Sequence, residues 1–347
     1  MGMITLSITI RDVAKKAGVS SATVSRVLNQ SDTVTARTKE HVLQVIQEMG
    51  YFPSQVARSL SKSETRTIGV VVPDINNPFY GEVIKGISQV ADENDLNILL
   101  CDTDENLQRE KKSLFMLKEH RMRGIIIAPI SDTDDSSSEY LTLLENLGIP
   151  IVLLGRDVKH STFDGVFIDN VRGAFDGVNA FIEEGHADIA IIAFSQSTNT
   201  GRDRLIGYKK AMALHNLPVL EQNIYFSDSN NIYSSYNITR KILRRPDRPT
   251  AIFTCNNIIT LGCIKALAEA GLSIPRDMAL IGFDEIQILN ILNMQISMIA
   301  RPTYDMGKEA MRILLKRLQS VERGFKTAER VIMMPKLLSY GSERFCP

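Results

Sequence analysis

Residues 9–29 read TIRDVAKKAGVSSATVSRVLN, and this stretch decides how the start of the chain folds. Thr9 and Asp12 have the spacing of a capping box, which predicts that a helix begins here. Gly18 is expected to end that helix and Ser20 to begin a second one, because apolar residues recur at helical spacing on both sides. The next apolar stripe predicts a third helix. Two short helices joined by a tight turn and backed by a third are typical of the helix-turn-helix DNA-binding unit.

The second of these helices carries the candidate base-reading residues, because in the helix-turn-helix arrangement it enters the major groove. Arg26 is the only long cationic donor on this helix, so we expect it to contact guanine in a bidentate way. A three-helix protein-interaction domain with a surface arginine is the alternative. The expected DNA-contacting residues of this region are Thr9, Ser20, Ser21, Ala22, Thr23, Ser25, Arg26 and Asn29.

Charge is distributed unevenly along the 347-residue chain, although its 40 Lys and Arg balance its 40 Asp and Glu. Residues 1–66 contain nine basic and five acidic residues, and the remainder has the opposite excess. A basic segment ahead of an acidic body is typical of a nucleic-acid-binding module joined to a different module. Chance scatter of surface charge is the alternative.

Composition restricts the class of protein further. With 44% apolar and 23% charged residues the chain is not disordered, and its length predicts two or three domains. No apolar run reaches the roughly 18–20 residues that span a bilayer, and the first residues do not read as a secretory signal. We therefore expect a cytoplasmic protein. Its cysteines lack disulfide or metal-ligand spacing and are expected to be reduced: Cys101, Cys255, Cys263 and Cys346.

From residue 67 onward, apolar strand-like runs alternate with helical stretches. This alternation predicts parallel sheets that are covered by helices on both faces. The runs are too many for one modest sheet, so we expect two α/β subdomains. The expected strands are residues 68–72, 96–101, 124–128, 151–154, 165–168, 189–194, 251–254 and 279–283.

Ligands of open α/β sheets bind beyond the carboxyl ends of the strands, so residues that follow strands are candidate binding residues. Here they combine aromatic rings, amides, guanidinium groups and a carboxylate, which suits a small polyhydroxylated or acidic molecule. Ordinary roles are the alternatives: Asn77 as a turn residue, Phe79 as a core residue and Asp284 as a helix cap. The candidates are Asp74, Asn76, Asn77, Phe79, Tyr80, Arg156, Arg202, Arg204, Asn256, Asn257, Asp284 and Arg301.

Between these two parts, residues 53–61 form a segment too short to be a stable helix alone, and a polar linker follows it. The segment lies within GYFPSQVARSL at residues 50–60, which precedes TIGVVVPDINNPFY at residues 67–80. Together with the helix-turn-helix stretch, these motifs resemble the signature of the LacI/GalR-type (lactose-repressor) family of bacterial transcription regulators. The resemblance runs over essentially the whole chain.

The resemblance implies an N-terminal all-α helix-turn-helix DNA-binding domain followed by a two-lobed, periplasmic-binding-protein-like α/β effector-binding and dimerisation domain. A hinge helix and linker would join them. The chain is expected to cross between the lobes near Asp169, Ile299 and Val331. The expected bounds are 1–52 for the DNA-binding domain, 53–66 for the hinge and linker, and 67–347 for the effector domain, with an N-lobe of about 67–168 and 302–329 and a C-lobe of about 169–299 and 332–347.

The resemblance also implies roles for individual residues. In this family two hinge helices lie in the minor groove, and a leucine wedges into the central base step. Leu60 holds that position, and Val56 and Ala57 belong to the same hinge. Arg301 stands where Gln is common, and Asn257 where Asp is usual, so this pocket is less negative than others. The positions that match effector-contacting residues are Asn77, Phe79, Tyr80, Arg156, Arg204, Asn256 and Asp284.

We therefore interpret the sequence as a ligand-responsive DNA-binding transcription regulator, a repressor of carbohydrate-utilisation genes whose homodimer binds a palindromic operator. The effector would act allosterically, through different affinities for two states. A transport-type sugar-binding protein and an α/β-scaffold enzyme are the alternatives. No GxGxxG follows the first strand, and the sequence contains neither a P-loop nor a G-x-S-x-G motif, so we expect no catalysis, no cofactor and no metal.

The charges of the candidate pocket predict the chemistry of its ligand. Arg156, Arg204 and Arg301 are expected to face a single carboxylate, Asp284. An unpaired buried cation is costly, and a guanidinium group matches the geometry of a carboxylate or phosphate. We therefore expect an acidic sugar or a sugar phosphate. In the alternative, Arg301 points away and pairs with Asp305 in the helix that follows.

Overall fold

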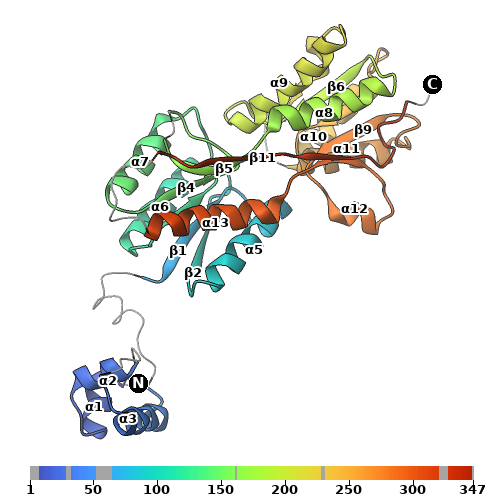
Figure 1. The fold of residues 1–347 in the computed structure, drawn as a ribbon. Helices are drawn as coiled ribbons and strands as arrows, with labels where there is room; N and C mark the ends of the chain where they lie inside the picture. Colours follow the sequence, from blue (N-terminus) through green and yellow to red (C-terminus); the bar gives the residue numbers. More distant parts are fainter. Residues whose placement is uncertain are drawn as a thin grey trace, which may run out of the picture. The chain divides into compact units, whose positions relative to one another are not determined.

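The structure is a computed structural model that describes residues 8–28, 33–51, 65–160, 162–227, 231–319 and 327–345. The chain divides into two compact units, Met1–Thr65 and Arg66–Pro347 (Figure 1). The described part of the smaller unit is helical, and the larger unit contains two β-sheets with helices on their faces. None of the helices in the described ranges is long and apolar enough to cross a membrane.

The smaller unit confirms the helix-turn-helix pattern. The Asp12 carboxylate accepts hydrogen bonds from the N–H of Thr9 at 2.8 Å and from its hydroxyl at 2.6 Å. Ser20 caps the next helix by accepting a hydrogen bond from the Thr23 N–H at 3.1 Å. The described helices are α1 (Ile10–Lys16), α2 (Ser21–Leu28) and α3 (Ala36–Met49). Their inward side chains form one core: Val13, Ala14, Ala17, Val24, Val27, Val42 and Val45.

The larger unit forms two six-stranded sheets within the described residues. The first has the order β11-β5-β4-β3-β1-β2 and is parallel throughout, and the second has the order β12-β10-β9-β8-β6-β7 with only β12 antiparallel. The first sheet consists of β1 (Thr67–Val72), β2 (Asn97–Asp102), β3 (Ile125–Ile127), β4 (Ile151–Leu154), β5 (Asp164–Ile168) and β11 (Arg330–Met333). The second consists of β6 (Ile189–Ala193), β7 (Ile224–Phe226), β8 (Ala251–Thr254), β9 (Ala279–Phe283), β10 (Ser297–Ala300) and β12 (Lys336–Leu338).

Helices cover both faces of each sheet, as the strand–helix alternation predicts (Figure 1). We call the first sheet with its helices the first lobe, and the second sheet with its helices the second lobe. The first lobe contains α5 (Pro78–Asp92), α6 (Leu107–Glu119), α7 (Asp135–Asn146) and α13 (Thr303–Gln319). The second contains α8 (Asn170–Glu183), α9 (Asn199–Leu214), α10 (Ile232–Leu243), α11 (Asn257–Glu269) and α12 (Gln287–Ile291), with a short 3-10 turn at Glu221–Asn223.

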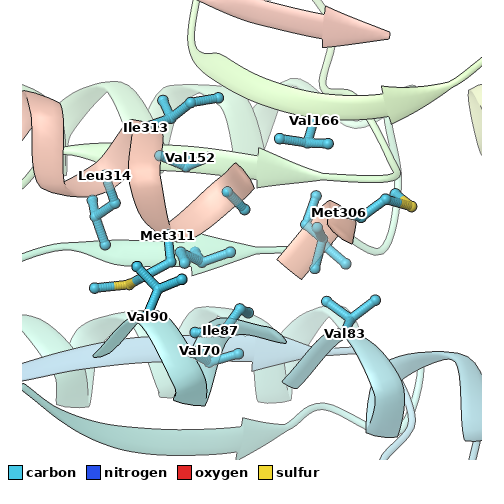
Figure 2. Packing of buried hydrophobic residues seen from close by; sticks show 14 of the residues in the cluster. Val70, Val83, Ile87, Val90, Val152, Val166, Met306, Met311, Ile313 and Leu314 are labelled. Atoms are coloured by element: carbon cyan, nitrogen blue, oxygen red, sulfur yellow. The ribbon is translucent and has the colours of Figure 1, made fainter. Parts of the chain in front are cut away.

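Two of these helices, α5 and α13, pack against each other and against the first sheet, although they lie more than 200 residues apart in the chain (Figure 2). A methyl group on Gly86 would lie 2.1 Å from the Tyr304 carbonyl oxygen, and one on Gly307 would lie 2.0 Å from that of Val83. The two glycines therefore allow the helix backbones to touch. Figure 2 shows the side chains around this contact: Val70, Val83, Ile87, Val90, Val152, Val166, Met306, Met311, Ile313 and Leu314.

Three connections join the lobes in the described part of the chain. The first follows β5 at Asp169, which caps α8, and the second follows β10 and leads into α13. Both lie at or within three residues of the positions expected. The third follows Met333, two residues past the expected position, because Val331 is still paired with Val166 in the first sheet. The first lobe therefore extends to Met333, past its expected bound at about residue 329.

Candidate functional site

The exposed side of α2 is the candidate DNA-reading surface. Ala22 and Arg26 lie on this side, whereas Val24 and Val27 are buried in the helical core. Of the other predicted contacts, Thr9 and Ser20 are exposed, and Ser21, Thr23 and Ser25 are half-buried. The remaining predicted DNA contacts lie outside the described residues: Asn29, Val56, Ala57 and Leu60.

A second candidate site lies in the larger unit, where strand-end loops of both lobes enclose a cavity of about 50 Å³. Space of this size holds a few water molecules, so a sugar would need more room between the lobes. Every effector-contacting residue predicted from the sequence lines this cavity. The lining residues are Asn77, Phe79, Tyr80, Gly155, Arg156, Phe194, Thr200, Gly201, Arg204, Cys255, Asn256, Asp284 and Arg301.

The loop after β1 provides the aromatic wall and a link between the lobes. Asn77 Oδ1 accepts hydrogen bonds from the Phe79 N–H at 3.1 Å, which caps α5, and from Asn257 Nδ2 of the second lobe at 2.9 Å. The rings of Phe79 and Tyr80 meet edge to face at 4.8 Å, and both side chains are buried. Asn77 and Phe79 thus have the turn and core roles that were the alternatives, and they also line the cavity.

Asp284 and Arg301 form a buried ion pair at the cavity, with 2.6 Å between Oδ1 and Nε. The Arg301 guanidinium group also lies 3.7 Å above the centre of the Phe79 ring. The alternative in which Arg301 pairs with Asp305 is therefore wrong. Neither Oδ1 nor Nε makes a hydrogen bond with the described residues, because the pair is close but poorly aligned. Asp284 also has a φ of 77°, a backbone conformation that non-glycine residues adopt mostly at functional sites and turns.

Arg156 has a partner that the sequence did not reveal. Its Nη1 and Nη2 donate to the two carboxylate oxygens of Glu105 at 2.9 and 2.7 Å. The Arg156 side chain is only 12% exposed. Burial alone would lower its pKa, but Tyr80 and Glu105 together raise that pKa, so the guanidinium stays charged. Glu105 follows β2, so the rule that side chains after parallel strands meet at one edge of a sheet applies to it as well.

Arg204 differs from the other two guanidinium groups because no described carboxylate pairs with it. Its Nε donates to Asn170 Oδ1 at 2.9 Å, its Nη1 donates to the Cys255 carbonyl oxygen, and its plane lies 3.7 Å from the centre of the Phe283 ring. The residue is 6% exposed. Burial lowers the pKa of Arg204 to about 10, and Asp284 only partly opposes this effect. The positive charge of Arg204 is therefore poorly compensated.

The lobes also meet at a second group of contacts beside the cavity, which we call the rim latch: Asp132, Ser197 and Arg202. Arg202 of α9 forms a bidentate ion pair with Asp132, which follows β3. The Asp132 N–H also donates to the Ser197 carbonyl oxygen at 3.2 Å. Arg202 was a candidate binding residue, but it forms this latch and does not line the cavity.

Comparison with known proteins follows the same division of the chain. The family model described as "Bacterial regulatory proteins, lacI family" matches residues 9–54, and the one described as "Periplasmic binding protein-like domain" matches residues 178–342. The chain is 37% identical over 318 residues to the HTH-type transcriptional regulator RegA of Clostridium saccharobutylicum, which covers 91% of this chain and 94% of the relative.

Two solved structures extend the comparison to the fold. The transcriptional regulator CelR in complex with cellobiose is 27% identical with a TM-score of 0.72, covering 96% of this chain and 99% of that one. The Lac repressor dimer bound to operator and the anti-inducer ONPF is 24% identical with a TM-score of 0.85, covering 97% and 99%. At 24% identity, the similarity to the Lac repressor supports the fold alone.

Proposed function

Because the chain belongs to the lacI family of bacterial regulatory proteins, in which it is a DNA-binding transcription regulator and not an enzyme, we propose that it represses carbohydrate-utilisation genes in response to a sugar-like effector. The effector would bind in the cavity between the lobes. The observation that carries this proposal is the buried Asp284–Arg301 pair at that cavity, whose Oδ1 and Nε lack hydrogen bonds. A hydroxyl group of a ligand could donate to the carboxylate and accept from the guanidinium group.

The rest of the cavity also suits a polyhydroxylated ligand. Aromatic rings such as Phe79 cover the apolar face of a sugar, while amides and guanidinium groups hydrogen-bond to its hydroxyls. The relative CelR was solved with cellobiose, which supports a carbohydrate ligand for a protein of this fold. A transport-type binding protein would share the cavity but has no use for the helix-turn-helix unit.

On the DNA side, we propose that a cytoplasmic homodimer binds a palindromic operator through two copies of α2. The proposed domains are 1–52 for DNA binding, 53–66 for the hinge and linker, and 67 onward for effector binding and dimerisation. Effector binding changes the spacing of the lobes and thereby the affinity for the operator. By linkage, operator binding changes the affinity for the effector by the same factor.

The first test is operator recognition by Arg26. We expect Arg26→Ala to weaken binding to an operator selected from random palindromes by about 1–3 kcal/mol per half-site, with relaxed base choice. Fluorescence anisotropy with selected and random DNA measures both effects. Arg312→Ala, on the exposed side of α13, is the matched control. An equal loss on selected and random DNA would make Arg26 a phosphate contact and contradict the proposal.

The second test is the effector response. A thermal-shift screen of sugars, sugar acids and sugar phosphates identifies ligands, because a bound ligand raises the melting temperature. We expect Asp284→Asn and Arg204→Met to bind the operator like the wild type but to lose the response to the ligand found. Glu309→Gln, which removes a surface ion pair with Arg312, should respond normally. An unchanged response in both cavity variants would place the effector elsewhere.

A further inference from the structure

The charged groups at the cavity do not balance one another. Arg156, Arg204 and Arg301 provide three guanidinium groups, and Glu105 and Asp284 provide two carboxylates. The pocket therefore retains one uncompensated positive charge, not the two that the sequence predicted from Asp284 alone.

The Glu105 pair removes Arg156 as an anion site. Both oxygens of Glu105 accept from the two terminal nitrogens of Arg156, and Nη1 also lies 3.4 Å from the Pro129 carbonyl oxygen. A ligand anion would have to displace a carboxylate that already matches the guanidinium fork. Arg156 can therefore contact a neutral hydroxyl of a ligand without attracting a second negative charge.

Two further carboxyls do not enter this count. Glu110 lies near Arg156, but its oxygens accept hydrogen bonds from the Ile130 N–H and the Ser137 hydroxyl, and burial raises its pKa. Asp203 neighbours Arg204 in the chain but does not line the cavity, and burial raises its pKa as well. Among the described residues, neither carboxyl forms an ion pair with a guanidinium group that lines the cavity.

Arg204 holds the remaining charge. It is buried, it donates to an amide oxygen and a carbonyl oxygen, and it stacks on an aromatic ring, all of which are uncharged partners. Retaining a buried cation in such surroundings is costly unless an anion joins it. A single carboxylate at the cavity would cancel the charge, whereas a neutral ligand would leave it and a phosphate, with a charge near −2, would exceed it.

We propose that the effector is a sugar acid carrying one negative charge, and that Glu105 sets this preference by neutralising Arg156. This inference rests on the proposed function, because it takes the cavity between the lobes as the effector site. Glu105 acts on specificity through Arg156 and is a positioning residue. Its removal should leave a second uncompensated guanidinium and shift the preference toward a doubly charged ligand.

Isothermal titration calorimetry of the full-length protein tests the preference for a sugar acid. Each hexose and pentose is titrated in three forms: the neutral sugar, its sugar acid and its phosphate. For the wild type we expect that at least one sugar binds, and that its acid form binds at least about tenfold more tightly than its neutral and phosphorylated forms. For Glu105→Gln the phosphate should gain about tenfold relative to the acid. Glu105→Asp keeps the charge and should keep the wild-type order, and Glu309→Gln controls for loss of a glutamate charge elsewhere.

Arg204→Met gives an independent readout if Glu105→Gln does not fold, since it should abolish the preference for the acid over the neutral sugar. The inference is overturned if the wild type prefers a neutral sugar or a phosphate, or if Glu105→Gln folds and keeps the wild-type order. A neutral sugar that binds and controls operator affinity would leave the proposed function intact. If no compound of the three classes binds, the proposed sugar-like effector fails together with the inference.

Discussion

At the scale of single residues, His186 shows how burial of a titratable group makes stability depend on pH. The residue is 3% exposed, its Nδ1 lies 2.8 Å from Thr250 Oγ1, and its Nε2 lies 3.1 Å from the Glu343 carbonyl oxygen. Burial lowers the pKa of His186, against the opposing effect of the backbone carbonyls near it. The folded protein therefore keeps a neutral imidazole at pH values where the unfolded chain already binds a proton.

We accordingly predict that His186 lowers the melting temperature as the pH falls below about 6.5, the ordinary pKa of histidine, until the lowered pKa of the folded state is reached. Calorimetry at about pH 7.5 and 5.5 measures this loss, which should be smaller in His186→Gln. His120→Gln, at the exposed end of α6, should keep the wild-type difference. An identical pH dependence in His186→Gln and wild type would contradict the prediction.

The residues that line the cavity could be predicted from the sequence because side chains that follow parallel strands meet at one edge of a sheet. The rule predicts which residues lie at the site, but it does not predict which side chains pair with each other there. Glu105 pairs with Arg156 across 51 residues of sequence, which no local pattern encodes. The alternative partner of Arg301 was Asp305, in the helix that follows it. Because α13 begins at Thr303, Arg301 precedes the helix and reaches Asp284.

At the scale of secondary-structure elements, the contact between α5 and α13 depends on Gly86 and Gly307. We predict that Gly307→Ala destabilises the protein by about 1–3 kcal/mol, because its methyl group would overlap the rigid Val83 carbonyl and force the helices apart. Urea unfolding measures this loss. Gly81→Ala is the control, because Gly81 lies on α5 with open space around it. That change should be neutral or stabilise by up to about 1 kcal/mol. Equal stability of the two variants would show that the helices can separate freely.

The strands that the sequence predicted are those with continuous apolar runs, such as β6, β8 and β9, which are buried along their whole length. Four strands were not predicted: β7, β10, β11 and β12. β10 is a short strand that is buried over most of its length, whereas β7, β11 and β12 are three or four residues long and only partly buried. Without full burial they need no continuous apolar run, so they leave no pattern to find. The third connection between the lobes lies two residues past its expected position, because β11 extends the first lobe to Met333.

At the scale of the larger unit as a whole, polar contacts between the lobes oppose their separation. The Asn77–Asn257 hydrogen bond and the Arg202–Asp132 ion pair of the rim latch both join the two lobes. The Arg202 side chain is 38% exposed and that of Asp132 7% exposed, so solvent screens part of their attraction. The latch should therefore bias the separation of the lobes without locking them together.

We predict that Arg202→Gln increases the fraction of molecules with separated lobes by up to about fivefold, the effect of losing about 1 kcal/mol from a partly exposed ion pair. The Asp132 amide reports this directly, since its N–H donates to the Ser197 carbonyl oxygen of the other lobe. Hydrogen–deuterium exchange without added effector should be correspondingly faster at that amide. Arg172→Gln removes an ion pair with Asp176 inside α8 and should leave the rate unchanged. If exchange at Asp132 is equally slow in Arg202→Gln and in wild type, the hydrogen bonds between the lobes, and not the ion pair, hold the rim together.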